Sequence, residues 1–309
     1  MRVFITGAAG FVGGHAIRDF RQAGHTVVAM VAPGQAMQRD DVEAVETLDL
    51  LDAAALADAI ARHRPDACLH LAGIAFVPQA WKQPQQAIAV NVNGTLNVLE
   101  AFRTHRRDAR VLAVTSAQIY GNAHRDDVLH EDMPPEPETL YALSKAAADG
   151  AALLYAREYN MPVMTARPCN HIGPGQSESF VVSAFARQLI AIQRGAAAPV
   201  MKVGNLASRR EFTDVRDMVR AYRLLLEKGH GGLAYNVASG KLITIQALLD
   251  TMCGIAGVRP EVEVDPALFR PTDTQPTLDI RRLIDHTGWR PEIALTDTLR
   301  DVLADFSHR

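Results

Sequence analysis

Residues 2–13 read RVFITGAAGFVG, an apolar run that leads directly into a turn with three glycines. We expect a strand over Arg2–Thr6, a turn that holds Gly7, Gly10 and Gly13, and a helix that ends near Gly24. Glycines let the backbone approach a pyrophosphate closely, and the unpaired N–H groups of a helix N-terminus point at it. The spacing is GxxGxxG rather than GxGxxG, and its strand–turn–helix context favours dinucleotide binding over a purely structural turn.

Beyond this turn, short apolar runs alternate with helical patterns. We expect strands at 25–31, 67–73, 110–116 and 162–166, and helices at 51–64, 84–105 and 145–159. This alternation predicts an α/β fold, a Rossmann-type doubly wound parallel sheet covered by helices on both faces. After about residue 167 the alternation stops, and short strands at 200–203, 235–237 and 261–264 indicate a smaller α/β C-terminal lobe.

The division that we expect assigns 1–166, with returning segments near 211–240, to the larger domain. The smaller lobe then comprises 167–210 and 241–309.

The end of the second strand bears on the choice of cofactor. An NAD-binding fold usually places Asp or Glu there to hold the adenosine ribose 2′-OH, whereas this chain has Val31 followed by Ala32-Pro33-Gly34. Because no carboxylate stands there to repel the 2′-phosphate of NADP, the sequence slightly favours NADP over NAD. No arginine stands at that position, although Arg39 could reach it.

Residues 141–145 read YALSK and open an alanine-rich helical pattern. A four-residue spacing puts Tyr141 and Lys145 on one helix face. A phenol keeps its proton to about pH 10, but a nearby cation lowers its pKa, so that it can exchange a proton with an alcohol or ketone near neutral pH. The spacing alone is also common on solvated helix faces. Ser116, at the carboxyl end of a strand, is a credible third partner.

Composition restricts the classes of function. The 309 residues carry a net charge of −3 with no basic run, which argues against electrostatically driven nucleic-acid binding. Cys68, Cys169 and Cys253 are far apart and not in CxxC pairs, which argues against a disulfide framework and structural zinc. The chain shows no signal-peptide pattern and no apolar run of the ~18 residues that a membrane span requires. A cytoplasmic protein is therefore expected.

Three further positions have ordinary structural explanations. His70, at the end of the expected strand 67–73, is more typical of a packed histidine than of a ligand. Asn91, inside the expected helix 84–105, should bond neighbouring backbone. The loop arginines Arg209, Arg210 and Arg270 are typical of solvated side chains, but arginine is also the residue that binds a diphosphate through two hydrogen bonds.

Together these segments resemble the extended short-chain dehydrogenase/reductase family, in the nucleotide-sugar-modifying branch of epimerases and dehydratases. The resemblance covers essentially the whole chain. It depends on a combination of motifs: GAAGFVG (7–13), DLLD (49–52), HLAG (70–73), NVNGT (91–95), TSAQIYG (115–121), YALSK (141–145) and RREFTDVRD (209–217).

The resemblance implies a role for each matching position. Tyr141 would be the acid/base, Lys145 would lower its pKa and hold the nicotinamide ribose, and Ser116 would bond the reacting sugar oxygen. The cofactor, NADP or NAD with NADPH slightly favoured, would contact Gly7, Gly10, Phe11, Val12, Gly13, Asp49, Leu50, Leu71, Ala72, Gly73, Asn91, Tyr141 and Lys145. The nucleotide sugar would contact Gln118, Asn170, Val181, Arg210, Arg270 and Asp273, and no metal is implied.

Within the family, residues 167–189 and the tail are most similar to reductases of GDP-linked 4-keto-6-deoxy sugars. Such enzymes use NAD(P)H to convert GDP-4-keto-6-deoxy-D-mannose to GDP-D-rhamnose. The related 4,6-dehydratases need a carboxylate at the position of Gln118 to remove a proton from C5, and an amide cannot act as that base. Gln118 also departs from reductases that carry an acid there, which leaves a different keto-hexose or a heptose open as the substrate.

Two alternatives remain beside the reductase. One is a nucleotide-sugar 4-epimerase that keeps NAD bound, and the other is a non-catalytic relative, which would have no need of Ser116, Tyr141 and Lys145. The family further implies a homodimer in which the helices around 84–105 and 141–159 pair with those of a second copy.

Overall fold

A seven-stranded parallel sheet forms the centre of the computed structural model, which describes residues 1–37, 40–121, 128–269 and 276–309. Ile5 pairs with Ala29 on one side and with Leu69 on the other, so the first strand is central. The strand order is β11-β7-β5-β4-β1-β2-β3, which confirms the expected Rossmann-type α/β fold. The strands are β1 (Arg2–Thr6), β2 (Thr26–Val31), β3 (Ala44–Thr47), β4 (Ala67–His70), β5 (Arg110–Val114), β7 (Val163–Pro168) and β11 (Ala234–Val237).

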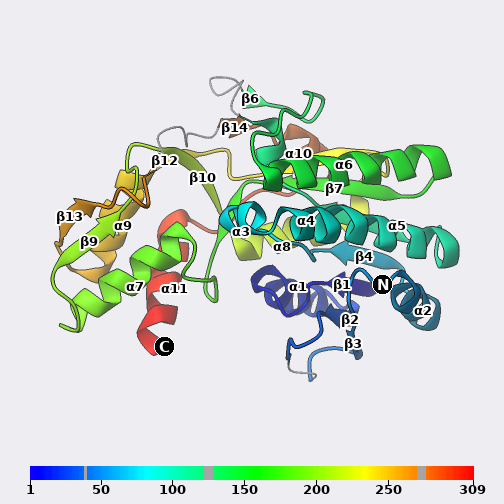
Figure 1. Cartoon of the computed structure of the whole chain (residues 1–309), viewed down its shortest axis with the longest axis horizontal. Coiled ribbons are helices and arrows are strands. Elements are labelled where there is room, and N and C mark those ends of the chain that lie inside the picture. Colours follow the sequence, from blue (N-terminus) through cyan, green and yellow to red (C-terminus); the bar gives the residue numbers. More distant parts are fainter. Residues whose placement is uncertain (38–39, 122–127, 270–275) are drawn as a thin grey trace.

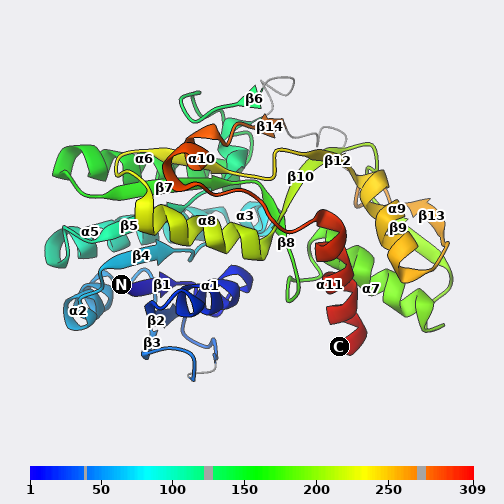
Figure 2. The ribbon, with the colours of Figure 1, turned by 180° about the vertical axis from the view of Figure 1, so that it is seen from behind.

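Helices cover both faces of this sheet (Figures 1 and 2). One face packs against α1 (Phe11–Gln22), α8 (Val215–Lys228) and α10 (Arg281–Thr287). The other face packs against α2 (Ala53–His63), α5 (Gly94–His105) and α6 (Leu140–Tyr159). The strands are buried on both faces, which explains why they read as continuous apolar runs rather than as alternating patterns.

The helix expected over 84–105 contains an irregular turn. It consists of α4 (Pro84–Ile88), a π-helical turn (Ala89–Asn93) and α5, all in one run. Single π turns inside helices are rare and often lie at functional sites. Here the π turn contains Asn91, whose side chain bonds the backbone of Ile74: its Oδ1 accepts from the amide nitrogen at 2.7 Å, and its Nδ2 donates to the carbonyl at 3.1 Å. The expectation that Asn91 bonds backbone is confirmed.

The smaller lobe lies at one end of the molecule (Figure 1). Its apolar core is formed chiefly by α7 (Val181–Gln193), α9 (Ile245–Ala256) and α11 (Leu295–His308). Two small sheets complete it: β12-β10-β8 (Leu242–Thr244, Arg209–Asp214 and Asn170–Ile172) and β13-β9 (Glu261–Val264 and Val200–Val203).

Residues 277–289, counted above with the smaller lobe, pack against the larger sheet instead. Leu278, Leu283 and Trp289 are buried in the same core as β1 and α8. The short strand β14 (Thr277–Leu278) pairs with β6 (Val128–Leu129), next to the larger sheet. Of the described helices, which also include α3 (Val77–Lys82), none is long and apolar enough to cross a membrane.

A buried ion pair joins the end of β7 to α6. Arg167 donates to both carboxylate oxygens of Asp149, from Nε at 3.1 Å and from Nη2 at 2.6 Å. Its Nη1 donates to the Tyr120 hydroxyl at 2.8 Å, and Thr115 donates to Asp149 at 3.0 Å. Both side chains of the pair are almost fully shielded from solvent. Such a pair need not stabilise the fold relative to apolar residues, but removing one partner leaves an uncompensated buried charge.

We therefore expect Asp149→Asn to lower the free energy of unfolding by about 3–5 kcal/mol, because the Arg167 guanidinium would keep its charge without a counter-ion. Urea unfolding followed by circular dichroism measures this change. The matched control is Glu158→Gln, which breaks the exposed Arg157–Glu158 pair and should cost less than about 1 kcal/mol. A loss below about 1 kcal/mol for Asp149→Asn would show that the pair is not needed.

Candidate active site

A cavity of about 1010 Å³ lies between the carboxyl ends of the central strands and the smaller lobe. Doubly wound folds bind ligands at this edge of the sheet, at the point where the strand order reverses. In this sheet that point lies between β1 and β4. The cavity is lined by nearly all the described residues predicted above: Gly7, Gly10, Phe11, Val12, Gly13, Asp49, Leu50, Leu71, Ala72, Gly73, Ser116, Gln118, Tyr141, Lys145, Asn170, Val181 and Arg210. Asn91 lies behind Gly73, and Arg270 and Asp273 are outside the described residues.

The glycine-rich turn needs its glycines for close approach. Gly7 has a φ of +69°, and a Cβ atom there would lie 2.9 Å from the Ala72 amide nitrogen. A Cβ at Gly13 would lie 2.4 Å from the Ala8 carbonyl oxygen. Helix α1 begins at Phe11, no side-chain hydrogen bond caps its N-terminus, and its first residues, Phe11–Gly13, line the cavity. This cradle fits the pyrophosphate of a dinucleotide.

Another part of the cavity is formed by residues at the ends of β2 and β3. It is lined by Val31, Ala32, Pro33 and Gln35, together with Asp49 and Leu50 from the following loop. Of these, the residues at the end of β2 (Val31, Ala32 and Pro33) have no carboxylate that would repel the 2′-phosphate of NADP. Arg39, the cation suggested above for this position, lies outside the described residues.

His70 is a buried structural residue, as expected. Its Nδ1 lies 2.8 Å from the Thr6 hydroxyl, and its Nε2 lies 3.0 Å from the Thr95 hydroxyl. Since Thr95 donates to the Asn91 carbonyl at 2.7 Å, His70 Nε2 must carry the proton that it shares with Thr95. Burial, with a smaller effect of the Lys145 charge, lowers the pKa of His70 to about 3, so the ring is neutral.

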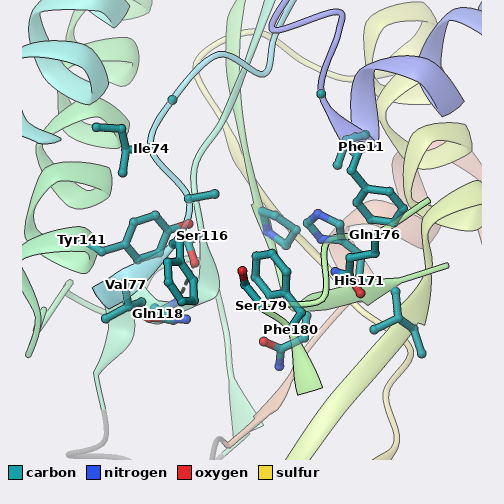
Figure 3. Close-up of a pocket in the computed structure, with 18 of the residues that line it drawn as sticks. Phe11, Ile74, Val77, Ser116, Gln118, Tyr141, His171, Gln176, Ser179 and Phe180 are labelled. Carbon is teal, nitrogen blue, oxygen red and sulfur yellow. Dashed lines mark hydrogen bonds between the residues drawn. The ribbon is translucent and has the colours of Figure 1, made fainter. Parts of the chain in front are cut away.

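Ser116, Tyr141 and Lys145 meet at one wall of the cavity (Figure 3 shows the first two). Ser116 caps the short 3₁₀ turn Ala117–Tyr120, and its Oγ accepts from the Gln118 amide nitrogen at 3.2 Å. Tyr141 and Lys145 lie on the first turns of α6, and the ammonium of Lys145 donates to the Val114 carbonyl at 3.0 Å. Helix α6 begins there because the Thr139 hydroxyl accepts from the Ala142 amide nitrogen at 3.0 Å.

Burial sets the protonation of this group. It raises the pKa of Tyr141 above its ordinary value, and a hydrogen bond with Ser116 acts in the opposite direction. Burial also lowers the pKa of Lys145 to about 8. Desolvation of the phenolate is the larger effect on Tyr141, so the net shift of its pKa is upward. The role expected of Lys145, lowering that pKa, stays a prediction.

The cavity is also lined by residues that the sequence analysis did not single out. Phe76 and Phe180 come from the two sides of the cavity, and their rings meet edge to face at 6.0 Å. His171 and Gln176 follow Asn170 on the lobe side (Figure 3). A glycine- and proline-rich loop gave no signal that these side chains would face a ligand. Among the described residues, no group of three or more His, Cys, Asp or Glu side chains could hold a metal ion.

Comparisons with known proteins agree with this geometry. A model of the GDP-mannose 4,6-dehydratase family matches residues 4–302. The GDP-6-deoxy-D-mannose reductase of Pseudomonas aeruginosa is 36% identical over 100% of this chain and 98% of its own length.

Two solved structures share the fold. RMD from P. aeruginosa, complexed with NADPH, is 36% identical with a TM-score of 0.86, and the match covers 100% of this chain and 99% of that one. UDP-glucose 4-epimerase from Thermus thermophilus, in complex with NAD, is 29% identical with a TM-score of 0.87, and the match covers 99% of each chain. The chain therefore belongs to the GDP-mannose 4,6-dehydratase family of NAD(P)-dependent extended short-chain dehydrogenases/reductases.

Proposed function

We propose that this protein reduces the C4 ketone of a GDP-linked 4-keto-6-deoxy sugar with NADPH, and that the GDP-4-keto-6-deoxy-D-mannose to GDP-D-rhamnose conversion is its reaction. The observation that carries the proposal is the meeting of Ser116, Tyr141 and Lys145 at a cavity that also contains the glycine-rich turn. The full-length similarity to the P. aeruginosa reductase supports the choice of substrate. The larger domain would bind the cofactor, and the smaller lobe would bind the nucleotide sugar.

Each residue of the wall has a role in this reaction. When bound, the reduced nicotinamide supplies a hydride to the ketone carbon. Tyr141 then gives its phenolic proton to the sugar O4, which becomes the product hydroxyl. Ser116 holds O4 next to the phenol, and Lys145 binds the hydroxyls of the nicotinamide ribose. Since burial raises the pKa of Tyr141, the phenol is protonated at neutral pH and ready to act as an acid.

Gln118 distinguishes this site from the active site of a 4,6-dehydratase. It lines the cavity beside Ser116, where a 4,6-dehydratase would need a base to remove a proton from C5. An amide has no such basicity, so the ketone is the substrate rather than an intermediate on the way to elimination.

A 4-epimerase is the second candidate, favoured by the similarity to the T. thermophilus enzyme. It would use the same three residues but would oxidise and then reduce C4, with NAD bound throughout. Purification with stoichiometric NAD, and turnover without added cofactor, would favour this function and overturn the reductase.

Tyr141→Phe should lower kcat for the ketone reduction by about 10²–10⁴-fold, because the proton donor is lost. The affinity for NADPH should change little, which fluorescence titration of the bound cofactor measures. Tyr155→Phe is the matched control on the same helix, because that hydroxyl bonds Glu100 at 2.5 Å, outside the set of residues that line the cavity. Full activity of Tyr141→Phe would support a non-catalytic relative.

Calorimetry with NADPH present should show that GDP binds at least about tenfold more tightly than UDP or dTDP. A site whose polar groups bond the edge of guanine would leave those groups without hydrogen-bond partners when uracil or thymine is bound. A preference for UDP or dTDP would overturn the substrate assignment, retain the oxidoreductase, and favour the epimerase.

We further propose a homodimer through α5 and α6. Leu143 and Leu154 are each 48% exposed on α6, and their spacing of three turns puts them on one stripe. Light scattering should give about twice the 33.6 kDa of one chain, and Leu154→Asp should shift the mass toward the monomer. Val262→Asp, a control at an exposed apolar residue of β13, should leave the mass unchanged. A monomeric parent at micromolar concentration would refute the dimer.

A further inference from the structure

An apolar surface lies beside the proton donor and has no role in the reaction described above. It is formed by Ile74 and Val77, which are half-buried, line the cavity and pack against the cluster of Ala80, Ala87 and Tyr141. In Figure 3 both side chains lie on the same side of the cavity as Tyr141. Neither side chain has a polar atom, so the part of a ligand that lies against this surface gains no hydrogen bond from it.

Hydrogen bonds of the main chain hold this surface in place. The Ile74 amide nitrogen donates to Asn91 Oδ1 at 2.7 Å, and the Ile74 carbonyl accepts from Asn91 Nδ2 at 3.1 Å. Val77 is the first residue of α3, and the Phe76 carbonyl accepts from the Gln79 amide nitrogen at 2.9 Å in the first turn of that helix. Because α3 packs against α6, the surface is fixed relative to the helix that carries the proton donor.

Two aromatic rings continue the apolar surface toward the smaller lobe. Phe76, between Ile74 and Val77 in the chain, lines the cavity, as does Phe180 at the start of α7. The two rings meet edge to face at 6.0 Å. A ligand hydroxyl placed against these side chains would lose its hydrogen bonds to water without gaining one in return. Such a loss weakens binding about ten- to hundredfold.

The chemistry of the proposed substrate indicates which of its groups reaches this surface. Around the C4 ketone, the sugar ring carries a hydroxyl on C3 and, on C5, the carbon C6. Ser116 and Tyr141 are assigned to the oxygen of C4, and Gln118 stands where the base of a 4,6-dehydratase would reach C5. C5 and C6 would then lie on the Gln118 side of that oxygen, and Figure 3 shows Gln118 and Val77 on the same side of the cavity. In a 6-deoxy sugar, C6 is a methyl group, the one apolar substituent of the ring.

We propose that the surface of Ile74 and Val77 contacts the C6 methyl group of the bound sugar and selects a 6-deoxy sugar over its 6-hydroxy counterpart. These two side chains are specificity-determining residues. They take no part in proton transfer, but they accept a methyl group where a CH₂OH group would leave its hydroxyl unpaired. The assignment rests on the proposed function, because it takes the ligand to be a GDP-linked 6-deoxy sugar.

The test compares two nucleotide sugars that differ only at C6. GDP-D-rhamnose carries a methyl group there, and GDP-D-mannose carries CH₂OH. Neither has a ketone, so neither is turned over when NADPH is bound, and calorimetry can measure both dissociation constants. We expect the parent to bind GDP-D-rhamnose about ten- to hundredfold more tightly than GDP-D-mannose.

Val77→Thr and Ile74→Thr each place a hydroxyl on the surface and retain a β-branched side chain. That hydroxyl can bond O6 of GDP-D-mannose and removes part of the apolar contact with the methyl group, so the ratio of the two dissociation constants should fall at least about threefold. Val262→Thr, at an exposed position of β13, is the matched control and should keep the ratio of the parent. Each protein is compared with itself, and its affinity for NADPH is measured separately, so a folding defect is not mistaken for lost selectivity.

A fall of the ratio in either variant supports the proposal. A parent that binds both GDP sugars equally would overturn it. A preference that is undiminished in both threonine variants would also overturn it, because another group would then recognise C6. A parent that binds NADPH but neither GDP sugar would refute the proposed function and this assignment with it, so the two failures are distinguishable.

Discussion

A continuous series of buried hydrogen bonds joins the first strand of the sheet to the helix that carries Tyr141. Thr6 on β1 bonds His70 on β4, His70 bonds Thr95, and Thr95 bonds the carbonyl of Asn91. The Asn91 side chain then donates to Ser144 on α6 at 2.9 Å. An unpaired polar group at this depth would cost about 1–3 kcal/mol, so each member stabilises the position of the next. The site depends on this series, because it sets α6 relative to the central strands.

The same series explains features of the cavity wall that are otherwise unrelated. Asn91 reaches Ile74 and Ser144 from within the π turn, which a regular helix over 84–105 would not contain. Gly73 must lack a side chain, because a Cβ there would lie 2.8 Å from Asn91 Oδ1 and 3.2 Å from Lys145 Nζ. Asn91 thus shapes the site from behind its wall, although the sequence motif alone placed it among residues that contact the cofactor.

The sequence predicted the fold and most of the cavity, because those features depend on local patterns. The glycine turn, the central strands and the spacing of Tyr141 and Lys145 are all visible over a few residues. Strands β8 and β12, of three residues each, are too short to show a pattern, and their pairing with β10 is a long-range contact. The direction of the pKa shift of Tyr141 was also beyond local patterns, because desolvation is a property of the assembled cavity rather than of a helix face.

Protonation distinguishes the two functions that share this triad. A 4-epimerase must first remove a proton from the sugar hydroxyl, which requires a phenolate, whereas a ketone reductase needs only a proton donor. Burial raises the pKa of Tyr141 and lowers that of Lys145 to about 8. Both shifts favour the neutral form of the side chain over the charged one. A neutral phenol beside Ser116 is the state from which a ketone receives its proton. This protonated state fits the proton donor that the proposed reduction requires.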